Sequence, residues 1–420
     1  MTILADAEAR RRIAGELGTT FFVEAAAGTG KTTELVGRIV ALIRSGAGTL
    51  RQIVAVTFTE KAAGEMKLRL RGKIEEARLS AAGEELERLD RALKELELAR
   101  IGTIHAFCTD VLHERPVEAG IDPLFEVSAE EDAEALADEA FDGWFQRILS
   151  DPPEGVRRVL RRRNRRDTPR EQLRRAMDTL CDHRDFPAPW RRDPFNRNGQ
   201  IDTLIDELRQ LGALAPLSSW ANDRLAMNLS EMARFVQEAT RLESVSGRDY
   251  DGLEAELRGF SRWRSWGWKG AQRTTFGALS RDEVLSRRDQ LKANLDAFIA
   301  ATDADLAPLL QDALKPAVAG YESLKTKLGR LDFLDLLLKT RDLIRDDAAV
   351  RRDLQARFSH FFVDEFQDTD PLQAEILILL AADDLGQSDW RAVRPVPGKL
   401  FLVGDPKQSI YRFRRADVAI

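Results

Sequence analysis

The stretch that most constrains this chain is "FFVEAAAGTGKTTEL" at residues 21–35, an apolar run that leads through a glycine-bearing loop into a helical pattern. Gly28 and Gly30 let backbone N–H groups approach an anion at a helix N-terminus. Lys31 adds an ammonium for phosphates and Thr32 a hydroxyl for Mg²⁺. We therefore expect a phosphate-binding loop for ATP, formed by Ala25, Ala26, Ala27, Gly28, Thr29, Gly30, Lys31, Thr32 and Thr33. The alternative is a glycine-rich helix entry without a ligand.

A pair of carboxylates supplies the second half of such a site. In "FFVDEFQDTDPLQ", residues 361–373, Asp364 and Glu365 directly follow an apolar run. A phosphate-loop ATPase needs one carboxylate acting on Mg²⁺ at a strand end and a residue that orients or activates the attacking water. Asp364 suits the metal role together with Thr32, and Glu365 suits the general base. The alternative is an acidic cap on a strand-to-turn junction.

The order of strand and helix patterns predicts the fold class. Strands are expected at 21–25, 52–58, within 99–108, at 360–366 and at 399–405, and helices at 6–17, 32–46 and 60–80. Strands that alternate with helices indicate an α/β fold with a parallel sheet. From about 129 to 345 helix formers dominate, which predicts a large, mostly helical insertion that interrupts the sheet.

Composition constrains the partners only weakly. The net charge of −6 carries no basic excess that would indicate nucleic acid, although local patches matter more than the total. Two distant cysteines favour free thiols in a reducing compartment. No apolar run reaches the ~20 residues that span a bilayer, and the first residues lack a secretory pattern. We expect a cytoplasmic protein.

Several motifs occur together in a fixed order. They are "AAAGTGKTTEL", "AVTFTEKAAGEMKLRLR", "GTIHAFC", "LDFLDLL", "VDEFQDTDPLQ" and "LVGDPKQSIYRFR". On these motifs the chain resembles the UvrD/RecB-like helicases of the AddA type, over residues ~6–125 and ~330–418. The resemblance implies a RecA-like phosphate-loop NTPase fold and an ATP-dependent DNA helicase that moves on single-stranded DNA, usually 3′ to 5′, in repair and recombination.

The resemblance also implies a domain plan. We expect residues 1–128 and 346–420 to form one RecA-like motor domain around an insertion at 129–345. The family's second RecA-like domain, which carries arginine fingers, is absent from this chain, so we expect weak or no activity from the chain alone. Partners implied are single-stranded or duplex DNA and a nuclease or helicase subunit, with ATP and Mg²⁺ as cofactors.

Residue roles follow from the same motifs. Gln408 is similar to the family's γ-phosphate sensor and joins Lys31, Asp364 and Glu365 as a catalytic residue. DNA contacts are implied for Phe58, Thr59, Lys61, Thr103, His105, Tyr411, Phe413 and Arg414. Aromatic stacking suits a motor that holds every base without preference. Phe58 and Phe413 could instead be core residues, and His105 a loop histidine.

Three further observations stay open at the sequence level. Residues 1–20 contain no glutamine of the kind that reads adenine in this family, and Arg415 stands where a glycine is usual. The arginine run at 157–166 and the Trp cluster at 263–268 favour a solvated helix face and internal packing over DNA contact. The alternative function is a nucleotide-dependent DNA-binding module without turnover; a phosphate-loop kinase leaves the later motifs unexplained.

Overall fold

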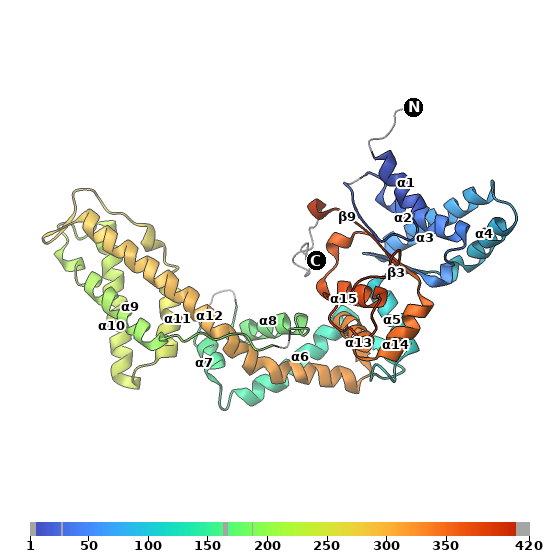
Figure 1. Ribbon diagram of the computed structural model, residues 1–420. Helices are drawn as coiled ribbons and strands as arrows, with labels where there is room; N and C mark the ends of the chain where they lie inside the picture. Colours follow the sequence, from blue (N-terminus) through green and yellow to red (C-terminus); the bar gives the residue numbers. More distant parts are fainter. Residues whose placement is uncertain (1–5, 27, 163–166, 187, 409–420) are drawn as a thin grey trace. The chain divides into compact units, whose positions relative to one another are not determined.

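The computed structural model describes residues 6–26, 28–162, 167–186 and 188–408. It divides the chain into two compact units (Figure 1). Unit 1 joins Met1–Glu130 to Thr326–Ile420, and unit 2 is Glu131–Lys325. Unit 1 is therefore built from two segments that lie far apart in the sequence.

A five-stranded parallel sheet forms the centre of unit 1. Its strands are β1 (Phe21–Glu24), β2 (Ile53–Thr57), β3 (Arg100–Thr103), β8 (His360–Val363) and β9 (Leu400–Gly404). They lie in the order β1-β9-β8-β2-β3, with every neighbouring pair parallel. The predicted α/β class and the predicted strands are confirmed. The late strands β8 and β9 lie between the early strands β1 and β2. The carboxyl ends of β1, β9 and β8, which are followed by the glycine loop, the predicted sensor and the acid pair, therefore lie side by side.

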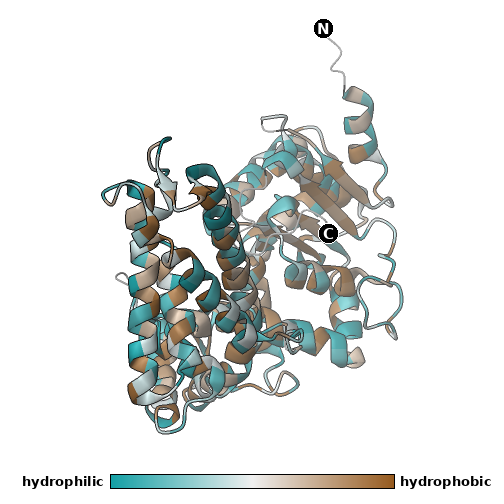
Figure 2. Ribbon diagram, turned by 90° about the vertical axis from the view of Figure 1, so that its left-hand side faces the viewer, coloured by the Kyte–Doolittle hydropathy of each residue, from teal (hydrophilic) through white to brown (hydrophobic). Residues whose placement is uncertain are grey.

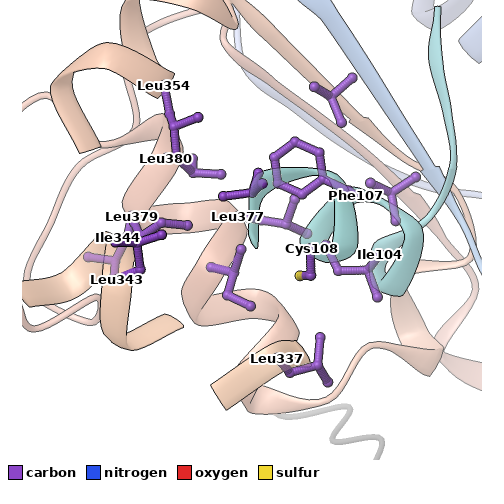
Figure 3. Packing of buried hydrophobic residues seen from close by; sticks show 14 of the residues in the cluster. Ile104, Phe107, Cys108, Leu337, Leu343, Ile344, Leu354, Leu377, Leu379 and Leu380 are labelled. Atoms are coloured by element: carbon purple, nitrogen blue, oxygen red, sulfur yellow. The ribbon is translucent and has the colours of Figure 1, made fainter. Parts of the chain in front are cut away.

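Side chains of alternate residues bury both faces of this sheet. Val54 and Val56 of β2 pack with the helices at 104–114, 333–346, 348–357 and 371–381, while Ile53 and Ala55 pack with the helices at 7–15, 31–45, 60–78 and 84–95. Figure 3 shows the first of these cores, where Cys108 lies among leucines of the surrounding helices. Burial on both faces explains why the strands read as continuous apolar runs.

Eight α-helices cover the sheet in the described part of unit 1. They are α1 (Ala7–Gly15), α2 (Lys31–Ser45), α3 (Glu60–Arg78), α4 (Glu84–Glu95), α5 (Ile104–Glu114), α13 (Phe333–Asp346), α14 (Ala348–Arg357) and α15 (Pro371–Ala381). Short 3₁₀ turns lie at η1 (Leu50–Gln52), η2 (Leu96–Leu98), η5 (Phe366–Asp368) and η6 (Pro406–Gln408). The helices expected at 6–17, 32–46 and 60–80 correspond to α1, α2 and α3.

Two features near the segment boundaries differ from the sequence-based plan. The two-residue strands β4 (Glu126–Val127) and β7 (Arg330–Leu331) pair in parallel, a contact that local patterns do not reveal. The helix α13, which the sequence placed in the insertion, packs against α5 and α15 within unit 1. The amphipathic pattern of α13 identifies a buried face but not the unit that covers it.

Unit 2 is helical apart from one small hairpin in its described residues. Its helices are α6 (Glu130–Ile148), α7 (Glu154–Leu160), α8 (Pro169–Asp182), α9 (Arg197–Gly212), α10 (Arg224–Ser246), α11 (Tyr250–Phe260) and α12 (Arg281–Lys327). The short elements are η3 (Ala215–Leu217), η4 (Arg264–Gly267), β5 (Thr275–Phe276) and β6 (Leu279–Ser280). The 47-residue helix α12 contributes to two separate cores, one with α9–α11 and one with α6–α8.

The structure describes residues 157–162 of the arginine run, and these form only partly a solvated helix face, while 163–166 lie outside the described residues. Arg158 is 1% exposed and bonds to Glu254 at 2.9 Å and to Asp305 at 2.6 Å. Arg157 and Arg161 are exposed and lie beside carboxylates of unit 2. Arg158 can be buried because two buried carboxylates compensate its charge. Its burial corrects the expectation of a solvated run.

The Trp cluster is divided between packing and surface. Trp266 is buried and donates its indole N–H to the carbonyl of Phe260 at 2.9 Å, whereas Trp263 remains exposed. The helices show both hydrophilic and hydrophobic faces in Figure 2. Among the described residues, no helix has the length and apolar character that crossing a membrane requires.

Candidate nucleotide-binding site

The loop that follows β1 has the backbone of an anion-binding turn. Gly28 and Gly30 have φ values of 75° and 91°, a region that L side chains rarely adopt. Gly30 precedes the first residue of α2, and the Thr29 hydroxyl closes the turn on the carbonyl of Ala26 at 2.7 Å. The loop therefore presents the N-terminus of a 15-residue helix, where unpaired N–H groups and the helix dipole favour an anion.

Two contacts join this loop to the acid pair after β8. The hydroxyl of Thr32 donates to Asp364 Oδ2 at 2.9 Å, and Lys31 Nζ donates to Glu365 Oε2 at 3.3 Å. Both pairs form because β9 alone separates β1 from β8 in the sheet. The structure thus brings together four residues that the sequence places in two distant motifs.

The two carboxylates have different surroundings. Asp364 is 8% exposed, and burial raises its pKa while the bond from Thr32 acts in the opposite direction. Glu365 is more open and has a φ of 55°, and it is the one residue other than glycine with positive φ in the described chain. A non-glycine residue in this region stores strain of about 1–2 kcal/mol.

The end of β9 lies beside the acid pair. Gln408, the predicted sensor, donates its amide to Asp405 Oδ2 at 2.6 Å. The amide of Gln367 bridges the two strand ends, since its Oε1 accepts from the Asp405 N–H at 2.8 Å and its Nε2 donates to Glu365 at 2.8 Å. No role was predicted for Gln367 from the sequence, and only the strand order reveals this contact.

A cleft of about 390 Å³ opens over these groups. Its lining comprises Thr32, Thr57, Phe58, Thr59, Ala62, Glu65, Met66, Arg69, Asp364, Glu365, Gln367, Asp368 and Gln408. Phe58 and Thr59, predicted to touch DNA, therefore face the cleft that also contains the acid pair. Thr59 additionally caps α3 by accepting from the Ala62 N–H, and Lys61 is exposed in the first turn of that helix.

Two further predicted DNA-contact residues, Thr103 and His105, lie at the end of β3. Thr103 caps α5 and donates to Glu60 at 2.8 Å, which ties the two DNA-contact motifs together. His105 packs edge-on against Phe333, with the ring centroids 5.5 Å apart, and burial lowers its pKa. Phe333 is 55% exposed. It belongs to "LDFLDLL", a motif for which no site role was predicted from the sequence.

The remaining predicted residues are three members of the glycine loop and four residues outside the described ranges. Ala25 donates its N–H to the Gly404 carbonyl at 3.1 Å, and Thr33 lies in the first turn of α2. Ala26 accepts the loop-closing bond from Thr29. Ala27, Tyr411, Phe413 and Arg414 lie outside the described residues.

A residue that the motifs do not single out reaches the loop from α1. Arg10 donates to the carbonyl of Thr29 at 2.7 Å and forms an ion pair with Glu34 in the first turn of α2. It belongs to the region where the sequence lacks the expected glutamine. An arginine in "DAEARRRI" was the available signal, but sequence alone cannot distinguish it from its neighbours Arg11 and Arg12.

The parallel sheet, the glycine loop after β1 and the acid pair after β8 define the class of phosphate-loop nucleotide-binding proteins. Within that class the chain belongs to the UvrD/REP helicase N-terminal domain family, whose sequence profile matches residues 6–420. The match includes both segments of unit 1 and all of unit 2.

Similar proteins are named as one subunit of an ATP-dependent helicase/nuclease. The protein from Syntrophomonas wolfei subsp. wolfei is 28% identical over 442 residues, which cover 96% of this chain and 33% of that protein. The protein from Geobacillus thermodenitrificans is 29% identical over 456 residues, which cover 95% of this chain and 35% of that protein. The chain thus spans about a third of the length of the curated relatives it matches.

Proposed function

We propose that this chain is the nucleotide-binding portion of an ATP-dependent motor that moves on single-stranded DNA in repair and recombination. The observation that carries the proposal is the double contact between the glycine loop and the acid pair, Thr32 to Asp364 and Lys31 to Glu365. A glycine-rich helix entry without a ligand gives no reason for a buried carboxylate to face this helix N-terminus.

The residues present fit Mg²⁺ bound together with a nucleotide. No group of three or more His, Cys, Asp or Glu side chains that could hold a metal occurs in the described ranges. Thr32 and Asp364 would hold Mg²⁺ together with phosphate oxygens, because hydroxyl and carboxylate oxygens suit this ion. The ion would neutralise charge that develops on the phosphates. Burial raises the pKa of Asp364, and a bound cation would compensate the charge of its ionised form.

The protein's own groups divide the remaining work. Lys31 would place its ammonium on the phosphates, which removes it from Glu365. Glu365 would then accept a proton from the attacking water. Gln408, on the cleft wall, would contact the terminal phosphate and change its bond to Asp405 when that phosphate leaves.

DNA is proposed to lie along the ends of β2 and β3. Phe58 and Thr59 line the cleft, and Phe333, which packs edge-on against His105, offers an exposed aromatic ring. Stacking of one base on such a face is worth ~1–3 kcal/mol and tolerates any sequence. Phe333 thereby joins the proposed DNA-contact residues. For Phe413 and Arg414, the proposed contact with DNA rests on the family resemblance.

We propose assembly with another nuclease or helicase subunit, because the relatives are named as subunits. Movement in the 3′ to 5′ direction is proposed from the family resemblance, and a cytoplasmic location from the two free cysteines. Hydrolysis by residues 1–420 alone is proposed to be weak, since the family's arginine fingers lie in a second motor domain. The alternative function is a module that binds nucleotide and DNA but does not hydrolyse ATP.

The test measures binding and hydrolysis of ATP by the full 420-residue chain with and without single-stranded DNA. Fluorescent ATP should bind with Mg²⁺, and Lys31→Ala should weaken binding at least tenfold, while Lys94→Ala, an exposed lysine on α4, should leave it unchanged. Glu365→Gln should keep binding and lose hydrolysis by ~10²–10⁴-fold. Binding without turnover in the unmodified chain favours the alternative, and equal binding by Lys31→Ala contradicts both functions.

A further inference from the structure

A buried glutamine connects two parts of the proposed site. Gln367 is 6% exposed, lies in η5 and reaches from the end of β8 to the end of β9. Its Oε1 accepts from the Asp405 N–H, and its Nε2 donates to Glu365 Oε2, each at 2.8 Å. Asp405 in turn accepts from the Gln408 amide at 2.6 Å. The hydrogen bonds therefore run without a break from Glu365 to Gln408.

The two ends of the Gln367 amide cannot be exchanged. A backbone N–H can only donate and an ionised carboxylate can only accept, so Oε1 must face Asp405 and Nε2 must face Glu365. A neutral amide is thus the side chain of this length that satisfies both partners. A glutamate would keep the bond to Asp405 but would place a second negative charge against Glu365.

The surrounding backbone is shaped to admit this amide. A Cβ atom on Gly404 would lie 2.8 Å from Gln367 Oε1, so any larger residue at the end of β9 would displace the glutamine. On the other side, the positive φ of Glu365 turns the chain directly before η5. The strained backbone at Glu365 and the lack of a side chain at Gly404 thus both leave room for the Gln367 amide between Glu365 and Asp405.

We propose that Gln367 is a positioning residue that links the predicted base Glu365 to the predicted sensor segment at Asp405–Gln408. The inference rests on the proposed function, because it assigns the link to the nucleotide cycle. When Lys31 turns from Glu365 to phosphates, the bond from Gln367 remains to hold the Glu365 carboxylate. A shift of Gln408 is then transmitted through Asp405 and Gln367 to the base, because one rigid set of hydrogen bonds includes them all.

The test is hydrogen exchange of the segment 400–408 in the full chain, with and without Mg²⁺ and a nonhydrolysable ATP analogue. Without nucleotide, Gln367→Met should speed exchange of the Asp405 N–H about tenfold, because this buried donor loses its acceptor. Gln367→Glu should leave that exchange unchanged. Gln355→Met is the matched control, since this half-buried glutamine donates to the Leu379 carbonyl away from the acid pair.

Nucleotide should slow exchange at 400–408 in the unmodified chain and in Gln355→Met, but not in Gln367→Glu or Gln367→Met. The decisive variant is Glu365→Gln combined with Gln367→Glu, in which the amide and the carboxylate trade places. This pair should restore the nucleotide-dependent protection, which a merely structural role would not do. Full protection in Gln367→Glu, or no rescue by the double variant, overturns the link.

Binding of fluorescent ATP is measured on the same samples to keep the two hypotheses apart. Absence of nucleotide binding in the unmodified chain contradicts the proposed function, and the exchange of Asp405 without nucleotide still decides whether Gln367 holds that N–H. Normal binding with protection that ignores Gln367 contradicts the inference alone.

Discussion

The hydroxyl of Thr32 donates a hydrogen bond to Asp364 across 2.9 Å, although the two residues lie 332 positions apart in the chain. This bond joins the first turn of α2 to the end of β8. The Thr32 hydroxyl and the Asp364 carboxylate would also hold a bound Mg²⁺, because oxygen ligands of this kind suit that ion.

We expect Thr32→Val to reduce the Mg²⁺-dependent part of ATP binding more than the Mg²⁺-independent part. Valine keeps the shape of threonine but offers no oxygen to the ion and leaves Asp364 without this donor. Titration of fluorescent ATP with Mg²⁺ and with chelator measures both parts. Thr32→Ser, which keeps the hydroxyl, serves as the control, and an equal loss in both conditions would exclude a metal role for Thr32.

The backbone of Glu365 offers a test of strain. Glycine tolerates the φ of 55° and alanine does not, so Glu365→Gly should be more stable than Glu365→Ala by about 1 kcal/mol. Urea unfolding of the two variants measures the difference, and both should lose hydrolysis. Equal stability of the two would show that this turn stores no strain.

Arg38 should be among the most damaging single losses in unit 1. It is 1% exposed, and its guanidinium donates to four backbone carbonyls within residues 13–19. Arg38→Met leaves these carbonyls unpaired and should lower the free energy of unfolding by about 3 kcal/mol. Arg44→Met, on the exposed side of the same helix, should change it by under ~1 kcal/mol. Hydrogen exchange of residues 7–20 should rise only in Arg38→Met.

Lys399 should make stability depend on pH in the alkaline range. Burial lowers the pKa of its ammonium from 10.5 to about 8, and Nζ donates to the Gln355 carbonyl at 3.0 Å. Between these two pKa values the unfolded chain binds more protons than the folded chain, so the stability contributed by this group rises with pH.

Lys399→Met removes that titration. The unfolding free energy of the unmodified chain minus that of Lys399→Met should therefore rise by about 1–3 kcal/mol from pH 7.5 to pH 10. Urea unfolding at four pH values measures the trend. Starting at pH 7.5 keeps His360, whose pKa is lowered by burial and by nearby Arg38 and Lys399, out of the range. A difference that is constant with pH would contradict the buried ammonium.

The two cysteines should report on the two units separately. Cys108 is buried in unit 1, where burial raises its pKa to about 12, and Cys181 is buried in unit 2. In Cys181→Ser and Cys108→Ser chains, the remaining thiol should react with a thiol reagent only as its unit opens. ATP with Mg²⁺ should slow the reaction of Cys108 and not of Cys181, since ligand binding stabilises the unit that holds the site. Equal slowing of both would contradict a site confined to unit 1.

Local spacing in the sequence was sufficient for the glycine loop, the acid pair and all five strands of the sheet. A loop of fixed glycine positions and a run of apolar residues carry their signal within about a dozen positions. The parallel α/β class followed from the alternation of such segments. The same reasoning placed α13 in the insertion, because an amphipathic helix shows which face is buried but not what buries it.

Tertiary structure alone decided the strand order, and with it the contacts of the site. Placement of β9 between β1 and β8 sets Gln367 against Asp405, Thr32 against Asp364, and Lys31 against Glu365. Helix packing also brought Phe333 to His105 in unit 1 and, in unit 2, buried Arg158 among carboxylates. These partners lie tens to hundreds of residues apart, and no local periodicity encodes which distant segments pair. The sequence alone therefore determined which chemical groups the site contains, and the fold determined which of them touch.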